Sequence, residues 1–444
     1  MAHIAWLGKK SPFCGNVTYG LTTTEALRSR GHRISFIHFD TPATSQLGLN
    51  GGVFANRSLQ IGADPGASPL IEAIVSDRRH GQSQHDPNSS SEHGIGNAGT
   101  MPNDPEVALP YLVKSQVYTI PSPGAQRELR ESLERLRPDV VHASLTLSPL
   151  DFRLPDLCQQ LGVPLVATFH PPFDAGLRNI TAGTQQLTYQ LYAPSLSRFD
   201  RVIVFSELQA DVLQRLGVRA ERLAVIPNGV DPQIWQPATT LSLELRQLQQ
   251  QFEGRRVFLY MGRIATEKNV EALLRAWRLV RPQGCVLLIV GDGPMRSALE
   301  ASSNDPSVLW WGYESRLEMR VALLQLAEVF LLPSLVEGLS LSLLEAMASG
   351  TACVATDAGA DGEVLEGGAG IVISTQGVTT QLRTLLPVLR DQPVLTAELG
   401  RRARERALER YTLNGNINAL EALYRDLPPP ATGAGNGNSA SIPA

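Results

Sequence analysis

Short apolar runs alternate with helix-like segments through most of this 444-residue chain. The first half opens with an apolar run at His3–Leu7 and a helical segment at Val17–Arg30. A second apolar run at Arg33–Phe39 completes a strand–helix–strand unit, and a new alternating series begins at Val257–Met261. Strands that alternate with helices form mostly parallel sheets with helices on both faces. The sequence therefore predicts an α/β protein with two doubly wound sheets.

One long stretch interrupts the alternation. Residues 41–110 are rich in Gly, Ser, Asn, Asp and Pro, so we predict an irregular insertion there. It contains His80, His85 and His93. A His-rich tract can bind metal, but three scattered histidines in a polar sequence are more typical of a solvated segment. We therefore predict no metal site in the insertion.

Turn-forming residues divide the rest of the chain. The turn at Ile226–Asp231 closes the first series, which places the first domain at residues 1–228 and the second at residues 229–413. A helix is expected at residues 414–427. Residues 428–444 are rich in Pro, Gly, Asn and Ser and are expected to form a disordered tail.

Composition excludes several functions and compartments. A net charge of −4 and a pI near 6.1 provide no basic footprint, so nucleic acid is not an expected partner. The four cysteines lie far apart without a CxxC pair, which favours reduced thiols and a cytoplasmic protein. Because no apolar run approaches 18 residues, membrane contact is expected to be peripheral at most.

The stretch Pro333–Gly350 has the pattern of an anion-binding turn. It follows an apolar run at Val329–Leu332 and leads through Gly338 into a helical pattern. The first amides of a helix lack partners and lie at the positive end of its dipole, so a phosphate binds there readily. Glu337 and Glu345 stand on either side and can accept hydrogen bonds from sugar hydroxyls. This combination is what a nucleotide-sugar site needs.

Ser342 and Glu345 also fit a second interpretation. Their spacing matches a capping box, in which the glutamate reaches back to an amide at the helix start and binds no ligand. From the spacing alone both interpretations stay open.

Two loops in the second half supply positive charge and tight turns. Arg263 and Lys268 lie between a predicted strand and the helix at Val270–Val280. Lysine occurs only four times in the chain, so Lys268 is a candidate for a role that needs a compact point charge, although a solvated lysine at a helix start is the alternative. The Gly291–Pro294 turn is predicted to be architectural.

Two loops of the first half follow predicted strands. Gly15 would let a backbone approach a ligand closely, and Asn16 follows it. His170 comes directly after the apolar run at Pro164–Phe169, at the edge of a parallel sheet where ligands bind. Each residue also has a purely structural interpretation. Gly15 can be present only because the turn requires a glycine, and His170 can form a hydrogen bond within its own turn.

Taken in this order and spacing, these motifs resemble those of the family 4 glycosyltransferases. The resemblance implies the GT-B fold, in which two Rossmann-like domains face each other across a cleft and the second holds most of a sugar nucleotide. It also implies that the helix at residues 414–427 crosses back onto the first domain.

The resemblance implies a role for each motif. Arg263 and Lys268 would bind the diphosphate, Glu337 the hydroxyls of the donor sugar and Glu345 the ribose. His170 would approach the donor sugar from the first domain. The remaining binding positions would be backbone or loop residues that contact the phosphates, the base or the sugar: Gly15, Asn16, Gly262, Gly312, Tyr313, Leu339, Ser340 and Leu341.

The family transfers a sugar with retention of anomeric configuration. Cleavage of the bond between the sugar and the phosphate puts negative charge on the nucleoside diphosphate, which Arg263 and Lys268 would stabilise. No Asp-x-Asp element stands in a suitable loop, so we expect neither a metal nor another cofactor. Two catalytic carboxylates of the glycosidase kind are not expected, because Glu337 and Glu345 bind hydroxyls in this scheme.

Several segments look similar to the digalactosyldiacylglycerol synthases of oxygenic photosynthetic bacteria. They are Ser11–Tyr19, Ala143–Phe152, Phe169–Asn179, Gly183–Pro194 and Ala360–Ile373. This likeness implies transfer of galactose from UDP-galactose to monogalactosyldiacylglycerol, with peripheral contact of the first domain with the cytosolic face of a membrane.

Other functions stay open at this point. A family 4 enzyme could use GDP-mannose, UDP-glucose or UDP-sulfoquinovose, and a catalytically silent GT-B protein could serve only in binding. An NAD-dependent dehydrogenase would also have two Rossmann-like halves. It would be expected to carry GxGxxG after its first strand, and residues 8–16 do not contain that pattern.

Overall fold

The computed structural model describes residues 1–10, 15–42, 105–115, 118–145, 147–173 and 180–429. Two of the predicted features lie outside these ranges. They are the greater part of the insertion, with its three histidines, and all but two residues of the tail.

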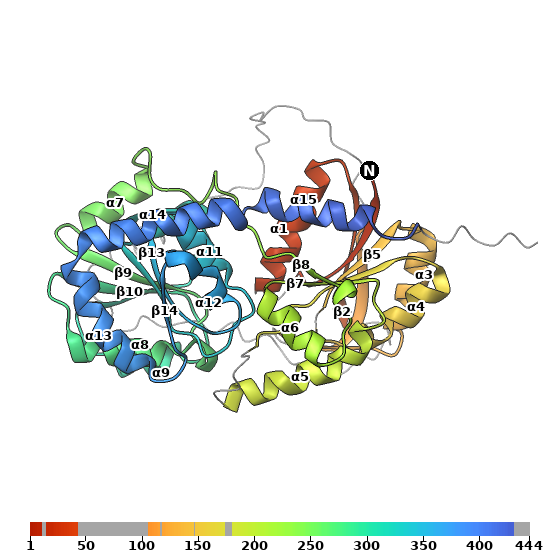
Figure 1. Ribbon diagram of the computed structural model, residues 1–444, viewed down its shortest axis with the longest axis horizontal. Helices are drawn as coiled ribbons and strands as arrows, with labels where there is room; N and C mark the ends of the chain where they lie inside the picture. Colours follow the sequence, from red (N-terminus) through yellow and green to blue (C-terminus); the bar gives the residue numbers. More distant parts are fainter. Residues whose placement is uncertain (11–14, 43–104, 116–117, 146, 174–179, 430–444) are drawn as a thin grey trace, which may run out of the picture. The chain divides into compact units, whose positions relative to one another are not determined.

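The chain forms two sheets (Figure 1), of which the first has eight strands in the order β4-β3-β2-β1-β5-β6-β7-β8. The strands are β1 (His3–Leu7), β2 (Arg33–Pro42), β3 (Val107–Lys114), β4 (Thr119–Pro121), β5 (Val140–Ser144), β6 (Leu165–Thr168), β7 (Arg201–Val204) and β8 (Leu223–Val225). The helices of this half are α1 (Gly15–Ser29), α3 (Ala125–Leu136), η2 (Pro149–Phe152), α4 (Leu154–Leu161), α5 (Ile180–Leu196), α6 (Glu207–Arg215) and η3 (Ala220–Arg222). All pairings are parallel except that of β4 with β3.

The second sheet has six parallel strands in the order β11-β10-β9-β12-β13-β14. They are β9 (Arg256–Met261), β10 (Cys285–Val290), β11 (Val308–Gly312), β12 (Val329–Leu332), β13 (Ala352–Thr356) and β14 (Ile371–Ile373). The helices are α7 (Leu243–Gln251), η4 (Thr266–Lys268), α8 (Val270–Val280), α9 (Arg296–Ala301), α10 (Leu317–Leu326), α11 (Leu341–Ala348), α12 (Asp361–Val364), η5 (Glu366–Gly368), α13 (Val378–Asp391) and α14 (Pro393–Arg410). The predicted pair of doubly wound sheets is therefore confirmed.

The last helix, α15 (Leu413–Arg425), packs against α1 of the first sheet. Glu421 accepts hydrogen bonds from Arg30, at 2.8 Å, and from His32, at 3.0 Å. Just before α15, the amide of Val230 donates to the carbonyl of Tyr411 at 2.9 Å. The chain thus passes between its two halves twice, along adjacent segments.

One prediction about the first sheet is wrong in part. Residues 41–42 and 107–110 are not part of an irregular insertion, because they belong to strands β2 and β3, with Pro42 opposite Tyr111. Beyond them, β4 pairs antiparallel with β3, and the amide of Ser115 donates to the carbonyl of Tyr118 at 2.9 Å. The pairing of β2 with β3 determines this outcome, and local composition does not predict such pairing.

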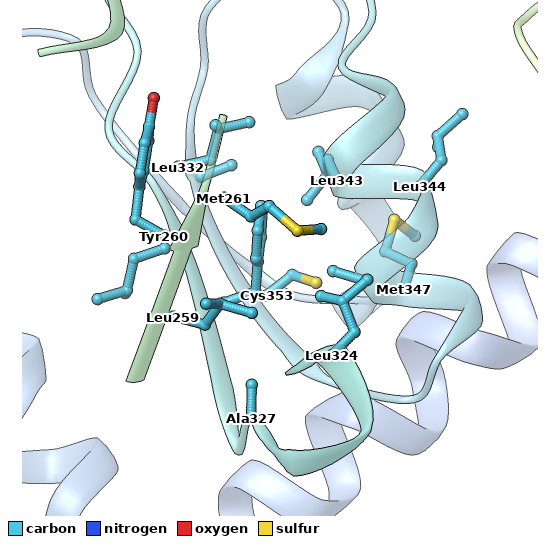
Figure 2. Close-up of a cluster of buried hydrophobic side chains, with 14 of the residues drawn as sticks. Leu259, Tyr260, Met261, Leu324, Ala327, Leu332, Leu343, Leu344, Met347 and Cys353 are labelled. Atoms are coloured by element: carbon cyan, nitrogen blue, oxygen red, sulfur yellow. The ribbon is translucent and has the colours of Figure 1, made fainter. Parts of the chain in front are cut away.

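Helix α11 is fixed on the second sheet by its apolar side. Leu343 and Met347 are fully buried and belong to the same core cluster as Met261 of β9 and Cys353 of β13 (Figure 2). Burial of each such side chain stabilises the fold by about 1.5–3 kcal/mol. The start of α11, where the predicted anion site lies, is therefore carried by a rigid part of the molecule.

Among the described residues, none of the helices is long and apolar enough to cross a lipid bilayer.

Candidate active site

The turn after β12 forms the start of α11. Ser340 is the N-cap residue, and its hydroxyl accepts a hydrogen bond from the amide of Leu343 at 3.4 Å. The capping box proposed for Ser342 and Glu345 is wrong, because the helix begins two residues earlier than that box requires and the side chain of Glu345 binds Arg320. Glu345 is therefore left for a different role.

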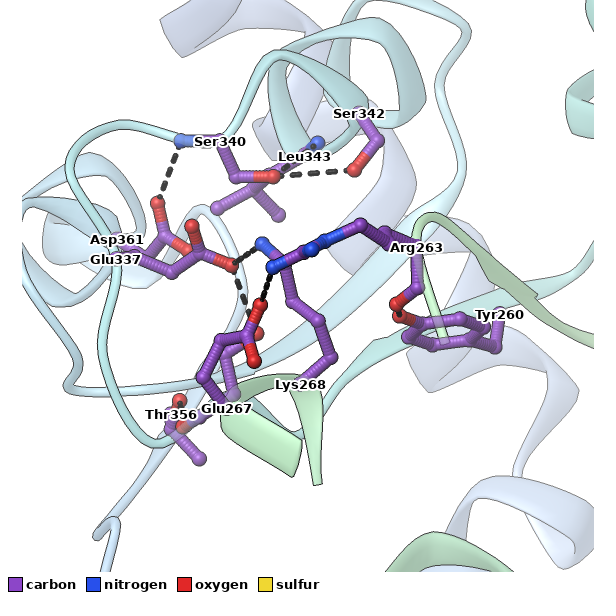
Figure 3. Close-up of polar contacts among 11 residues, drawn as sticks. Tyr260, Arg263, Glu267, Lys268, Glu337, Ser340, Ser342, Leu343, Thr356 and Asp361 are labelled. Atoms are coloured by element: carbon purple, nitrogen blue, oxygen red, sulfur yellow. Dashed lines mark hydrogen bonds and ion pairs between the residues drawn. The ribbon is translucent and has the colours of Figure 1, made fainter. Parts of the chain in front are cut away.

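Glu337 and Lys268 meet beside this turn (Figure 3). The ammonium group of Lys268 donates to Oε1 of Glu337, and the hydroxyl of Ser334 donates to the same oxygen at 2.8 Å. The side chain of Glu337 is 9% exposed and that of Lys268 is 21% exposed. A partly buried lysine is thus held next to a helix start, where both its charge and the helix dipole attract an anion.

Arg263 lies on the same side of the turn, on the loop after β9. Its guanidinium pairs with Glu267, and its carbonyl accepts a hydrogen bond from the hydroxyl of Tyr260 at 2.6 Å. The amide of Leu335 donates to the carbonyl of Glu267 at 2.8 Å, which ties this loop to the turn before α11. Two cationic side chains from one loop are therefore positioned at one helix start.

The Gly291–Pro294 turn packs against the backbone of the loop that contains Arg263. A Cβ at Gly291 would lie 1.9 Å from the carbonyl oxygen of Gly262, and the φ of Gly291 is +139°. The amide of Ile264 donates to the carbonyl of Asp292 at 2.9 Å. Only glycine permits such a close backbone approach. The turn is architectural, as the sequence predicted.

Asp361 is a site residue that the sequence analysis missed. It is fully buried, and its Oδ1 accepts a hydrogen bond from the amide of Ser340 at 3.0 Å. Burial, with a smaller contribution from Glu337, raises the pKa of Asp361 well above its usual range. Of the three residues whose amides were expected to bind phosphate, Ser340 therefore has its amide engaged by a carboxyl group in this structure. The only sequence signal was an acidic residue within a Gly-rich turn after an apolar run.

Glu345 lies one turn into α11 and faces α10. Both of its carboxylate oxygens are 2.8 Å from Nη2 of Arg320. Burial raises the pKa of the Glu345 carboxyl, and the charge of Arg320 opposes that rise. The structure therefore places Glu345 apart from the contacts of Glu337 and Lys268, in its own ion pair.

The loop expected to contact the nucleobase follows β11. Gly312 ends the strand with a φ of +88°, and its carbonyl accepts a hydrogen bond from the amide of Gly291 at 2.8 Å. Tyr313 is 57% exposed. Next to it, the buried Glu314 accepts hydrogen bonds from Trp311 and Arg316. The loop is thus fixed at its base and presents an exposed aromatic ring.

The remaining predicted residues belong to the first sheet. His170 is buried after β6, with its Nε2 2.7 Å from the hydroxyl of Ser144 and its ring 4.9 Å from that of Tyr19. Burial, followed by the charge of the buried Lys9, lowers the pKa of His170 to about 3. His170 is therefore neutral at physiological pH.

Gly15 and Asn16 form the start of α1.

The structure thus brings only some of the predicted residues together. Arg263, Lys268 and Glu337 lie on one side of the turn that leads into α11, with Gly262 next to Arg263 in the chain. The segment of His170 meets the same turn, because the amide of Phe173 donates to the carbonyl of Glu337 at 2.9 Å. Glu345 and the Gly312–Tyr313 loop are further parts of the second sheet domain.

Comparison with known proteins identifies the family. Residues 95–234 match the model described as Glycosyltransferase Family 4, and residues 255–391 match the model described as Glycosyl transferases group 1. The glycogen synthase of Mycobacterium tuberculosis is 30% identical over 300 residues, which cover 65% of this chain and 69% of that protein. The alpha-monoglucosyldiacylglycerol synthase of Streptococcus pneumoniae is 26% identical over 217 residues, which cover 45% of this chain and 47% of that protein.

The fold is also found among solved structures. The crystal structure of Anabaena HepE in complex with UDP and glucose aligns with a TM-score of 0.68 at 15% identity, over 96% of this chain and 100% of that one. The two Rossmann-type sheets, the two family models and the 30% identity to a glycogen synthase all indicate the same family. The chain belongs to the family 4 glycosyltransferases and has the GT-B fold.

Proposed function

We propose that this enzyme transfers a hexose from a UDP-sugar to an acceptor hydroxyl, with retention at the anomeric carbon and without a metal. The observation that carries the proposal is the position of Lys268 and Arg263 at the start of α11, beside Glu337. The binding of UDP and glucose by the structurally similar HepE supports a UDP-linked donor.

The charges fit the departure of a nucleoside diphosphate. When the bond between the anomeric carbon and the β-phosphate oxygen breaks, its electron pair goes to that oxygen. Lys268, Arg263 and the amides at the start of α11 stabilise the resulting charge, which is commonly the largest catalytic contribution. The acceptor oxygen attacks from the face that the diphosphate leaves, and the acceptor proton passes to a phosphate oxygen. The products are a glycoside and UDP.

The other residues orient the donor. Glu337 accepts hydrogen bonds from hydroxyls of the transferred sugar, while Ser334 and Lys268 hold its carboxylate. Glu345 binds the ribose, and Tyr313 lies against the base. His170, which is neutral, contributes a hydrogen bond to the sugar and does not act as a general acid. Gly15 and Asn16, at the start of α1, contact the donor sugar through their backbone.

Within this scheme, transfer of galactose from UDP-galactose to monogalactosyldiacylglycerol is the specific hypothesis to test. Its support is the likeness of several segments to digalactosyldiacylglycerol synthases and the sequence similarity to a synthase named for a diacylglycerol product. Glycogen synthase, which is also similar, is named for a different product, so the family alone does not select the acceptor. A lipid acceptor implies peripheral attachment of the first domain to a membrane.

The test separates donor from acceptor. Purified protein is incubated with UDP-galactose, UDP-glucose or GDP-mannose and with vesicles that do or do not contain monogalactosyldiacylglycerol, and both the free nucleotide and the lipid products are quantified. Digalactolipid from UDP-galactose alone is the expected result. Release of UDP without a lipid product would refute the lipid acceptor, and release of GDP alone would refute the UDP-linked donor. The Lys268→Met variant serves as the inactive control.

A further inference from the structure

We propose that Arg320 is a positioning residue of the nucleotide site, which holds the carboxyl group of Glu345 oriented toward the ribose of the donor. This inference rests on the proposed binding of ribose by Glu345. It assigns a role to an arginine that none of the family motifs in the sequence contains.

The ion pair joins the helices that precede and follow β12 in the sequence. Arg320 lies in the first half of α10, and Glu345 lies in the middle of α11. Nη2 of Arg320 is 2.8 Å from both carboxylate oxygens. The side chain of Glu345 is 7% exposed and that of Arg320 is 25% exposed. The carboxylate is therefore buried and the guanidinium reaches it from a more open side.

A second contact fixes the guanidinium itself. Its Cζ lies 5.2 Å from the ring centroid of Trp235, which is buried. The amide of Trp235 donates to the carbonyl of Asp231 at 2.9 Å, and its carbonyl accepts a hydrogen bond from Arg404 of α14 at 3.3 Å. A cation over the face of an indole ring is attracted to it electrostatically. Arg320 is thus also held by Trp235, which is itself hydrogen-bonded to α14.

The geometry leaves Glu345 capacity for a ligand. A carboxylate offers about four acceptor positions, and a single guanidinium nitrogen does not occupy them all. A ribose presents two vicinal hydroxyls that need such acceptors. Without the arginine, burial would raise the pKa of the Glu345 carboxyl further, and a protonated carboxyl has less acceptor capacity. Arg320 therefore keeps the acceptors available and aimed in one direction.

The contribution of Arg320 can be separated from general stability by changing the ligand as well as the protein. The affinities of UDP, 2′-deoxy-UDP and 3′-deoxy-UDP are measured by calorimetry for the wild type, Arg320→Met, Arg320→Lys and Glu345→Gln. Arg256→Met is the matched control. The side chain of Arg256 is 24% exposed, close to the value for Arg320, and it pairs with Glu328 at the end of the sheet where β9 begins. Circular dichroism checks the folding of each variant.

For the wild type we expect loss of a ribose hydroxyl to weaken binding about tenfold or more, as for a hydrogen bond to a charged group. In Arg320→Met and Glu345→Gln this difference should shrink to less than about threefold. The substitution weakens the binding of UDP but leaves the binding of the deoxy analogues unchanged. Arg320→Lys, which keeps the charge but not the planar fork, should retain part of the difference. Arg256→Met should retain all of it.

A full deoxy penalty in folded Arg320→Met would overturn the role of Arg320. Equal binding of UDP and both analogues by the wild type would overturn it together with the ribose role of Glu345, while binding of UDP would still support the diphosphate site. Failure of the wild type to bind UDP at all would instead refute the proposed donor.

Discussion

Replacement of Lys268 by methionine should separate catalysis from stability at this site. The side chain keeps its length and loses its charge. A unit charge about 4 Å from another contributes about 4 kcal/mol at an effective dielectric constant of about 20. Because Lys268 is 21% exposed, solvent screens part of this interaction. We therefore expect a loss of about 3 kcal/mol in stabilisation of the departing diphosphate, which lowers kcat about 100-fold.

The same substitution leaves Glu337 without its cation. The side chain of Glu337 is 9% exposed, so an unpaired carboxylate there should destabilise the fold by about 2–3 kcal/mol. Adding Glu337→Gln removes the orphaned charge. The double variant should therefore recover most of the melting temperature but none of the turnover.

The assay is initial-rate release of the nucleoside diphosphate at saturating donor, together with thermal unfolding. Arg275→Met is the control, since its pair with Glu271 on α8 is 55% and 60% exposed and should contribute little. Normal kcat in Lys268→Met would refute the reasoning. Recovery of turnover in the double variant would also refute it, because it would show that the lysine acts only by neutralising Glu337.

Three further predictions concern neighbouring residues. Because the pKa of Asp361 is raised in the folded protein, its burial costs stability as pH rises above about 4, where the unfolded carboxyl ionises. Asp361→Asn should therefore raise the melting temperature at pH 8 and have little effect near pH 4, and an equal effect at both pH values would contradict this. Because the pKa of His170 is lowered to about 3, the pH profile of kcat should show no limb near pH 6.5 from this residue; a limb that disappears in His170→Gln would show that it titrates. Gly291→Ala would place a Cβ 1.9 Å from the carbonyl oxygen of Gly262 at a φ of +139° and should cost about 3 kcal/mol or more of unfolding free energy, whereas an unchanged melting temperature would mean that the loop relaxes freely.

Much of the fold could be predicted because it rests on local patterns. Buried parallel strands such as Val286–Val290 are continuous apolar runs, and the helices between them have their own period. The order of strands depends on tertiary pairing, which such patterns do not report. This is why β2 and β3 extend into a stretch that its composition marks as irregular.

The candidate site could also be predicted only in part from the sequence. Lys268 and Glu337 could be proposed together because each stands on a recognisable motif, and the structure pairs them. The pairing of Arg320 with Glu345 could not, because it depends on how α10 and α11 are placed in the folded protein, and neither spacing nor composition encodes that placement. Asp361 was missed for a related reason, since its burial against the amide of Ser340 joins two turns that are far apart in sequence.

A crystal structure of this enzyme with bound UDP would show whether Lys268 and Arg263 bind the diphosphate. We predict that oxygens of the β-phosphate lie within about 3 Å of Nζ of Lys268 and of the guanidinium of Arg263, at the start of α11. A diphosphate that lies beyond hydrogen-bonding distance of both side chains would contradict it.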